Sequence, residues 1–181
     1  VPFAEQVCAD AWKLMEQIPV DWVGSDVLLF DAESVESQLT KLKKKPIDLL
    51  LIMQLTFTDA TMTVKIAKSF DVPLLFWSFP EKRTGGRLRL NSLCGVNLAA
   101  HALGKSGIQC DYINLSPNDP ETSEDLSFWI RAFQTRKNLS STKLAVIGKH
   151  PDGFHTCAFD SGKLKEISGV TVEQMELTDL F

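Results

Sequence analysis

Two apolar runs, IDLLLIM at residues 47–53 and VPLLFWSF at residues 72–79, decide the fold of this chain. Neither run alternates between apolar and polar residues, and continuous apolar runs of this length are typical of strands buried on both faces of a parallel sheet. Between them, apolar residues recur at helical spacing at Met62, Ile66 and Phe70. The three segments together predict a β-α-β unit.

The same alternation of helices and strands extends along the rest of the chain. Helical spacing of apolar residues predicts further helices, and short apolar runs predict further strands. The helices cover about residues 3–18, 35–42, 91–107 and 122–133, with a short one around Leu164, and the strands are VDWVG (20–24), IQCDYINL (108–115), KLAVIG (143–148) and VTVEQMEL (170–177). This order predicts an α/β fold, a doubly wound (Rossmann-like or flavodoxin-like), mostly parallel sheet with flanking helices.

A polar stretch, NLSSTK at residues 138–143, separates two parts of the pattern. We therefore predict an N-terminal α/β domain over residues 1–138 and the beginning of a second, incomplete α/β domain over residues 139–181. A doubly wound domain normally leads with a strand, whereas this chain opens with a helix. We therefore expect the N-terminal domain to lack its first strand in this sequence.

Composition and charge exclude several classes of function. The 181 residues are 44% hydrophobic and 23% charged, as in an ordinary α/β protein, and the formal net charge of -4 argues against a nucleic-acid-binding face. No apolar run approaches the roughly 20 residues that cross a bilayer, and the opening VPFAEQVCADAW lacks the features of a secretory signal, so we expect a cytoplasmic protein without membrane contact. Four scattered cysteines without a C-x-x-C pair indicate reduced thiols: Cys8, Cys94, Cys110 and Cys157.

Three polar loops follow predicted strands, at residues 54–59, 78–90 and 148–155. In open parallel sheets, ligands bind beyond the carboxyl ends of the strands. The first two loops offer hydrogen bonds and both signs of charge to a hydroxylated ligand, from Gln54, Thr58, Glu81, Lys82, Arg83 and Arg87. The alternative is that these loops are polar only because they are exposed.

The segment Thr84-Gly85-Gly86 lies between arginines and is a candidate phosphate cradle, because glycines let backbone N–H groups approach an anion. It matches neither the G-x-G-x-x-G nor the G-x-x-x-x-G-K-[ST] pattern. A tight turn in the loop is the alternative interpretation.

Asn91 and Ser92 lie at the start of a predicted helix, where unpaired N–H groups favour oxygen-rich or anionic ligands. The alternative for Asn91 is a simple N-cap, and His101, two turns further on, is expected to be a packed or surface histidine. His150, Asp152 and His155 match no zinc pattern, and Mg²⁺ or Mn²⁺ favours clustered carboxylates. The residues alone therefore predict a ligand-binding fold, with no catalytic residue and no metal site.

Three segments resemble the N-terminal region of L-fucose/L-arabinose isomerase-like proteins. They are FWSFPEKRTGGRLRLNSLCGVNLAAHAL (76–103), LAVIGKHPDGF (144–154) and GKLKEISGVTVEQMELTDLF (162–181). The resemblance implies an aldose–ketose isomerase in which a divalent metal, usually Mn²⁺, polarises the sugar oxygens while carboxylates move protons. It also implies that the acidic residues and histidine that hold the metal belong to later domains. This N-terminal fragment alone is then expected to bind no metal and to be inactive.

In the family, the N-terminal domain helps to build oligomers, and its strand-end loops reach the active site of a neighbouring subunit. The resemblance therefore implies a homo-oligomer, a trimer or a hexamer, with a sugar as its substrate. It also implies substrate contacts at Glu81, Arg83, Asn91 and Ser92, to which the strand-end position of Gln54 adds a fifth.

The sequence departs from the arabinose-type pattern at the helix that Asn91 opens. Those enzymes carry a glutamine and a histidine near its start, where this chain has Ser92, Leu93, Cys94 and Gly95. The sugar is therefore left open, and the arginines at 83, 87 and 89 suggest an anionic sugar derivative. Two alternatives from other classes are a non-catalytic sugar-binding or regulatory α/β module and a purely structural assembly domain.

Overall fold

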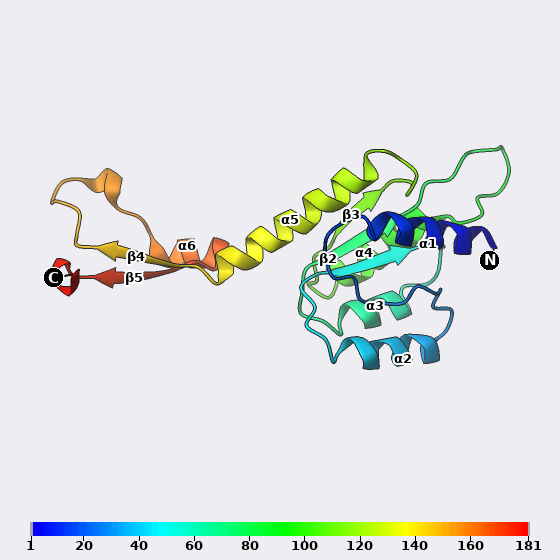
Figure 1. The fold of residues 1–181 in the computed structure, drawn as a ribbon, viewed down its shortest axis with the longest axis horizontal. Helices are drawn as coiled ribbons and strands as arrows, with labels where there is room; N and C mark the ends of the chain where they lie inside the picture. Colours follow the sequence, from blue (N-terminus) through cyan, green and yellow to red (C-terminus); the bar gives the residue numbers. More distant parts are fainter. Residues whose placement is uncertain (1, 181) are drawn as a thin grey trace. The chain divides into compact units, whose positions relative to one another are not determined.

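The computed structural model describes residues 2–180. The chain divides into two compact units, Val1–Ile130 and Arg131–Phe181. The first holds a three-stranded parallel sheet in the order β1-β2-β3, and the second holds a two-stranded parallel sheet of β4 and β5 (Figure 1). The predicted α/β class, with parallel strands and flanking helices, is confirmed. The division falls within helix α5 (Thr122–Ser140), and the domain boundary at residue 138 stays a prediction.

The sheet of the first unit consists of β1 (Leu50–Gln54), β2 (Leu74–Ser78) and β3 (Asp111–Asn114). All five residues of the central strand β2 are buried, as the run VPLLFWSF predicts. Strand β1 lies at one side of this sheet, and its first four residues are only half-buried. The prediction of burial on both faces is therefore wrong for IDLLLIM, because only one edge of β1 pairs with another of the described strands.

Four helices in the first unit accompany this sheet: α1 (Pro2–Met15), α2 (Ala32–Leu42), α3 (Thr61–Ala67) and α4 (Ser92–Gly104). One core cluster joins α3 and α4 to strand β2, through Ala67, Leu74, Phe76, Val96, Ala99 and Leu103. On α1, the residues at helical spacing form a buried stripe of Ala4, Cys8, Ala11 and Met15. The four helices predicted from apolar spacing in this part of the chain are confirmed.

The segment VDWVG at residues 20–24 is not a strand, so that prediction is wrong. Val20 and Val23 are exposed. The indole Nε1 of Trp22 donates to the backbone oxygen of Met15 at 2.8 Å. Trp22 therefore folds back onto the end of α1, and the apolar residues around it do not contribute to a sheet.

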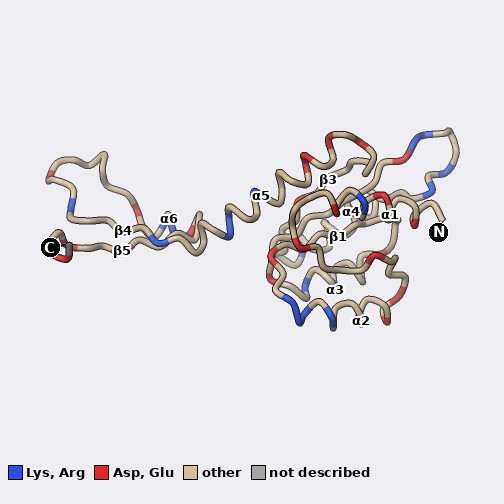
Figure 2. The backbone as a smooth tube through the Cα atoms, viewed as in Figure 1, with Lys and Arg blue, Asp and Glu red and all other residues tan. Residues whose placement is uncertain are grey.

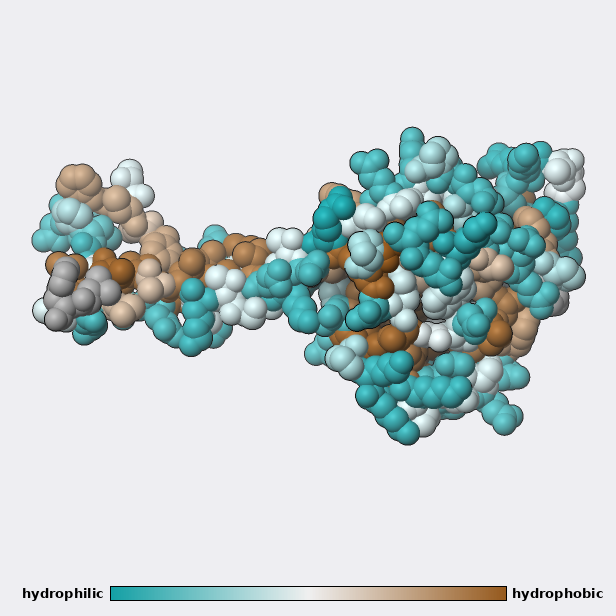
Figure 3. All heavy atoms as spheres, in the orientation of Figure 1, coloured by the Kyte–Doolittle hydropathy of each residue, from teal (hydrophilic) through white to brown (hydrophobic). Residues whose placement is uncertain are grey.

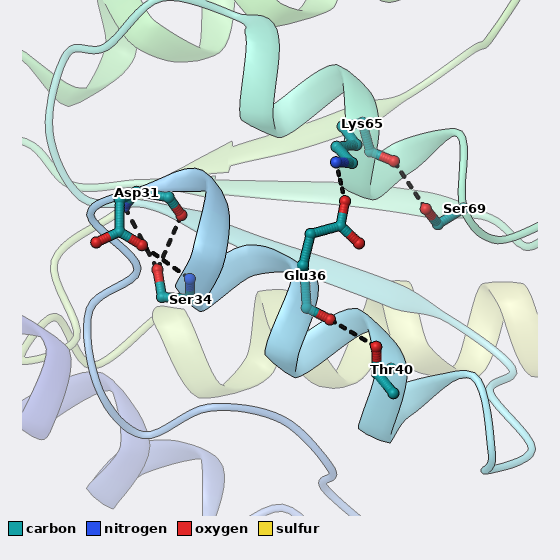
Figure 4. A network of polar contacts seen from close by, with 6 residues as sticks. All are labelled: Asp31, Ser34, Glu36, Thr40, Lys65 and Ser69. Atoms are coloured by element: carbon teal, nitrogen blue, oxygen red, sulfur yellow. Dashed lines mark hydrogen bonds and ion pairs between the residues drawn. The ribbon is translucent and has the colours of Figure 1, made fainter.

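Helices α2 and α3 contact each other, and one ion pair joins them (Figure 4). The carboxylate of Asp31 caps α2 by accepting from the backbone N–H of Ser34 at 2.8 Å, and this bond lowers the pKa of Asp31 below its usual value. Lys65 on α3 forms an ion pair with Glu36 on α2. Both side chains of the pair are about half exposed, so the pair adds little stability.

The second unit contains β4 (Lys143–Ile147), a 3-10 turn at His155–Cys157, α6 (Ser161–Ser168), β5 (Thr171–Met175) and a 3-10 turn at Leu177–Leu180. Both predicted strands and the short helix are confirmed. Gly169 ends α6 with φ 77°, and a Cβ there would lie 2.6 Å from the Cα of Ser140, so only glycine fits.

Apolar side chains remain on the surface of the second unit (Figure 3). They are Leu139, Leu144, Ile147, Phe154, Phe159, Ile167 and Leu177. Two parallel strands with one helix bury little apolar surface, since parallel sheets usually have both faces covered. In residues 2–180, no helix combines the length and the apolar character needed to cross a membrane.

Candidate functional site

The carboxyl ends of the three strands in the first unit form one row. Gln54 pairs in register with Ser78, and Ser78 with Asn114. Ser78 is fully buried, and its hydroxyl lies 2.8 Å from Oδ1 of Asn114 and 3.1 Å from the backbone oxygen of Ile113. This row is the edge at which ligands bind in open parallel sheets. We call it the carboxyl edge.

Gln54 is buried at the carboxyl edge, with 8% of its surface exposed. Its Nε2 donates to the backbone oxygen of Thr56 at 2.8 Å and to Oγ1 of Thr58 at 3.3 Å, and its Oε1 accepts from Oγ1 of Thr63 at 3.2 Å. A Cβ at Gly95 of α4 would lie 3.0 Å from Cγ of Gln54, so this position of the helix packs directly on the amide side chain. Both ends of the Gln54 amide are therefore used inside the protein.

Ser92 joins three elements at the carboxyl edge. It is the first residue of α4 and is 2% exposed. Its hydroxyl donates to the backbone oxygen of Gln54 and accepts from the backbone N–H of Phe79 at 2.9 Å. Ser92 and Gln54 thus fix the ends of β1 and β2 against α4. That either residue contacts a substrate stays a prediction.

Asn91 occupies the N-cap position of α4 in the left-handed conformation, with φ 52° and ψ 37°. Its side chain makes no capping hydrogen bond, so the interpretation of Asn91 as a simple N-cap is wrong. Among residues 2–180, Asn91 is the one non-glycine residue with positive φ. Such backbone strain gathers at ligand-binding sites, and asparagine tolerates it better than most residues. The amide of Asn91 is half-buried, and that it contacts a substrate stays a prediction.

The loop between β2 and α4 is closed by its own carboxylate. Glu81 accepts from the backbone N–H groups of Arg89 and Leu90, each at 2.5 Å. Leu90 is buried, and its backbone oxygen accepts from the N–H of Phe57 at 2.8 Å. The guanidinium of Arg89 lies 3.6 Å from the ring centroid of Phe3 on α1. We call the two hydrogen bonds that Glu81 accepts the Glu81 clasp.

The clasped loop presents basic side chains to solvent. Lys82, Arg83 and Arg87 are exposed, and within residues 2–180 no hydrogen bond or ion pair engages their side chains. Figure 2 shows these basic segments on the loop that projects from the first unit. Gly85 has φ 79°, and a Cβ added there would meet no atom within 4 Å, which supports the interpretation of Thr84-Gly85-Gly86 as a turn.

The neighbouring loop after β1 carries the carboxylate of Asp59, which accepts a hydrogen bond from the backbone. Asp59 accepts from the backbone N–H of Thr61 at 2.8 Å, and hydrogen bonding from Thr61 lowers the pKa of Asp59 below its usual value. Asp59 is therefore charged at neutral pH and bonded at the start of α3.

In the part of the chain that the structure describes, no group of three or more His, Cys, Asp or Glu side chains is placed to hold a metal ion. His150, Asp152 and His155 lie exposed in the second unit, and His101 lies on the exposed face of α4. Mn²⁺ prefers several oxygen or nitrogen ligands from clustered side chains. That this part of the protein binds no metal ion stays a prediction.

The structure brings the sequence-predicted residues Gln54, Glu81, Asn91 and Ser92 together at the carboxyl edge, and it adds residues there that the sequence analysis did not name. Ser78 and Asn114 were not singled out, although a polar residue at the end of an apolar strand is a visible signal. Phe3 carries no such signal, because its contact with Arg89 joins residues far apart in the chain.

The chain is similar to known proteins over most of its length. The family model described as "Fucose/sulfoquinovose isomerase, N-terminal domain" matches residues 5–140. A sulfoquinovose isomerase from Priestia aryabhattai is 31% identical over 159 residues, which are 88% of this chain and 36% of that protein. One from Alkalicoccus urumqiensis is 32% identical over 136 residues, 75% of this chain and 31% of that protein. The chain spans about a third of the length of these curated relatives.

Proposed function

The chain belongs to the fucose/sulfoquinovose isomerase family, as its N-terminal domain, and on that premise we propose that it forms the N-terminal part of a sugar isomerase that acts on a sulfonated aldose. The resemblance to fucose isomerases inferred from the sequence is thereby confirmed. The finer proposal rests on one observation, the unpaired basic side chains of the clasped loop beside the carboxyl edge. The names of the relatives point to the same kind of sugar.

A sulfonated sugar needs two kinds of recognition. Its sulfonate stays ionised at all physiological pH values and is matched by the planar donors of arginine. Arg83 and Arg87 supply such donors at the tip of the loop. The hydroxyl groups of the sugar need neutral donors and acceptors, which the amide of Asn91 supplies. The proposed role of this domain is therefore to bind and orient the sugar.

The proposal assigns the bond-making chemistry to another part of the protein. Aldose–ketose isomerisation moves hydrogen between C1 and C2, and Mn²⁺ supplies the polarisation of the sugar oxygens in enzymes of this type. We propose that Mn²⁺ is held by residues outside residues 2–180, because these residues do not fit it. No catalytic residue is assigned to this chain.

We further propose a cytoplasmic homo-oligomer, a trimer or a hexamer. Helix α4 supports this proposal, because its outer face exposes apolar side chains beside the polar Asn97 and His101. Leu93 is 37% exposed and Leu98 is 40% exposed, with the exposed Cys94 between them. An apolar face of this kind marks a protein contact. Free rather than disulfide-bonded cysteines support a reducing compartment.

The experiment is an isomerase assay on the longer protein of which we propose this chain to be the N-terminal part. Purified protein is incubated with sulfoquinovose and Mn²⁺, and the sugar is followed by proton NMR. We expect the resonances of the corresponding 2-ketose to appear, and chelation of the metal with EDTA to stop their growth. Binding of the sugar without conversion would instead support the non-catalytic sugar-binding module. If the protein neither binds nor converts the sugar, that result would contradict both the isomerase and the sugar-binding module.

A further inference from the structure

We propose that Glu81 is a positioning residue, whose carboxylate holds the basic loop in the conformation in which Arg83 and Arg87 bind the anionic group of the sugar. This inference rests on the proposed function, and it assigns Glu81 a role different from the direct substrate contact implied by the resemblance. It starts from the geometry of the carboxylate, both of whose oxygens are occupied by backbone N–H groups of the same loop.

The clasp joins the two ends of a short loop. Glu81 stands near the beginning of the loop, and its partners Arg89 and Leu90 stand at the end. Both bonds run from backbone N–H groups to a carboxylate, and hydrogen bonds of this charged kind are among the stronger ones in proteins. Closing a flexible loop costs conformational entropy, and these bonds offset that cost before a ligand arrives. The basic tip is therefore preorganised.

The end of the loop is also held from outside. The Leu90 side chain is buried, and its backbone oxygen accepts from Phe57 beyond β1. Arg89 lies over the ring of Phe3 and is thereby turned toward α1. Of the three arginines in the loop, Arg89 is thus committed to the fold, whereas the side chains of Arg83 and Arg87 make no hydrogen bond or ion pair within residues 2–180.

The clasp has a second effect, on charge. A free carboxylate at position 81 would lie in the same loop as Arg83 and Arg87 and would compete with an anionic ligand for them. Because the Glu81 carboxylate is bonded to two backbone N–H groups, it does not pair with these arginines. Neutralising Glu81 therefore has opposite consequences under two accounts. If only the negative charge of Glu81 matters, the neutralised variant binds an anion more tightly than the unmodified protein. If the clasp matters, the variant binds the anion more weakly.

The first test uses the 181-residue chain without any sugar. In Glu81→Gln the side chain keeps its size, but its amide group presents a donor where the carboxylate accepted one of the two bonds. We expect the backbone amides of Arg89 and Leu90 to exchange with D₂O about tenfold faster than in the unmodified chain, from the loss of a charged hydrogen bond. Glu124→Gln, an exposed glutamate on α5, is the control and should leave this exchange unchanged. Unchanged exchange in Glu81→Gln would overturn the clasp.

The second test uses the longer isomerase and compares KM with kcat. For Glu81→Gln we expect KM for sulfoquinovose to rise about tenfold, because a looser loop binds the anion less well, while kcat stays within about twofold. Glu81→Ala should act in the same direction and more strongly. A lower KM in Glu81→Gln, or a fall in kcat at constant KM, would overturn the positioning role.

The two tests separate this inference from the function on which it rests. If Arg83→Ala raises KM for sulfoquinovose and Glu81→Gln does not, the basic loop binds the sugar and the positioning role fails. If neither variant changes KM, the proposed sugar recognition fails, and the exchange rates at Arg89 and Leu90 still decide whether the clasp exists.

Discussion

Replacing Trp77 with alanine is expected to lower the free energy of unfolding of this chain by about 3–5 kcal/mol, the range for large aromatic residues in protein cores. Trp77 lies in the central strand β2 and is fully buried. Its indole Nε1 donates to the backbone oxygen of Leu115 at 2.9 Å, and its ring centroid lies 4.9 Å from that of Phe79. Alanine leaves a cavity, a lost aromatic contact and an unpaired carbonyl.

Urea unfolding followed by far-UV circular dichroism measures this loss. Trp77→Phe keeps an aromatic ring and removes the hydrogen bond to Leu115, so its cost should be clearly smaller than that of Trp77→Ala. Phe57→Ala is the matched control, because Phe57 lies just beyond the neighbouring strand and is 52% exposed. It should shift stability by less than about 1 kcal/mol. Equal losses in Trp77→Ala and Phe57→Ala would contradict the central place of β2 in the core.

The double substitution Arg83→Ala with Arg87→Ala is expected to raise KM for sulfoquinovose by about 10- to 100-fold in the longer isomerase. The physical reason is the loss of charged hydrogen bonds to the sulfonate. Because the loop is exposed and its charges are screened by solvent and salt, we expect the two arginines together to contribute about 1.4–2.7 kcal/mol, less than the roughly 1.5–3 kcal/mol that a single such bond contributes in a shielded site. We expect kcat to change little, because the arginines bind a part of the sugar remote from C1 and C2. Steady-state kinetics at about 0.1 M ionic strength measures both constants.

The matched control removes two positive charges elsewhere. Lys44→Ala with Lys45→Ala alters the exposed turn before β1, at the opposite end of that strand from the carboxyl edge. Its KM should stay within about twofold of the unmodified value. An equal rise in KM for both double variants would show that net charge, and not the loop, attracts the sugar. Partial recovery in Arg83→Lys would support a charged contact that also depends on the planar guanidinium.

Most of the α/β architecture could be predicted from the sequence, because continuous apolar runs are typical of buried parallel strands. The run VPLLFWSF became the buried strand β2, since it has a hydrogen-bonded neighbour on each side. The similar run IDLLLIM became a half-buried strand, because its position in the sheet, and not its composition, sets its burial. The segment VDWVG has good strand residues, yet the bond from Trp22 to Met15 directs it elsewhere. Local propensity does not contain such a tertiary contact.

The sequence predicts where the candidate site lies in the fold, but not the hydrogen bonds that its residues make. The order of strands and loops in the sequence predicts that Gln54, Glu81 and Asn91 lie near one edge of the sheet, and the structure places them there. The sequence does not reveal that Gln54 is satisfied within the protein or that Glu81 bonds its own loop, because both depend on backbone groups brought close only by folding. The left-handed backbone of Asn91 is likewise set by the loop before α4.

The most direct test of the central claim, that this family member selects an anionic sugar, is the ratio of kcat/KM for sulfoquinovose to kcat/KM for D-glucose. The two sugars differ at C6, where one carries a sulfonate and the other a hydroxyl group, so the ratio isolates recognition of the anion. We predict a ratio of about ten or more at about 0.1 M ionic strength, falling as salt is added. A ratio near one at both low and high salt, or a preference for D-glucose, would contradict the account.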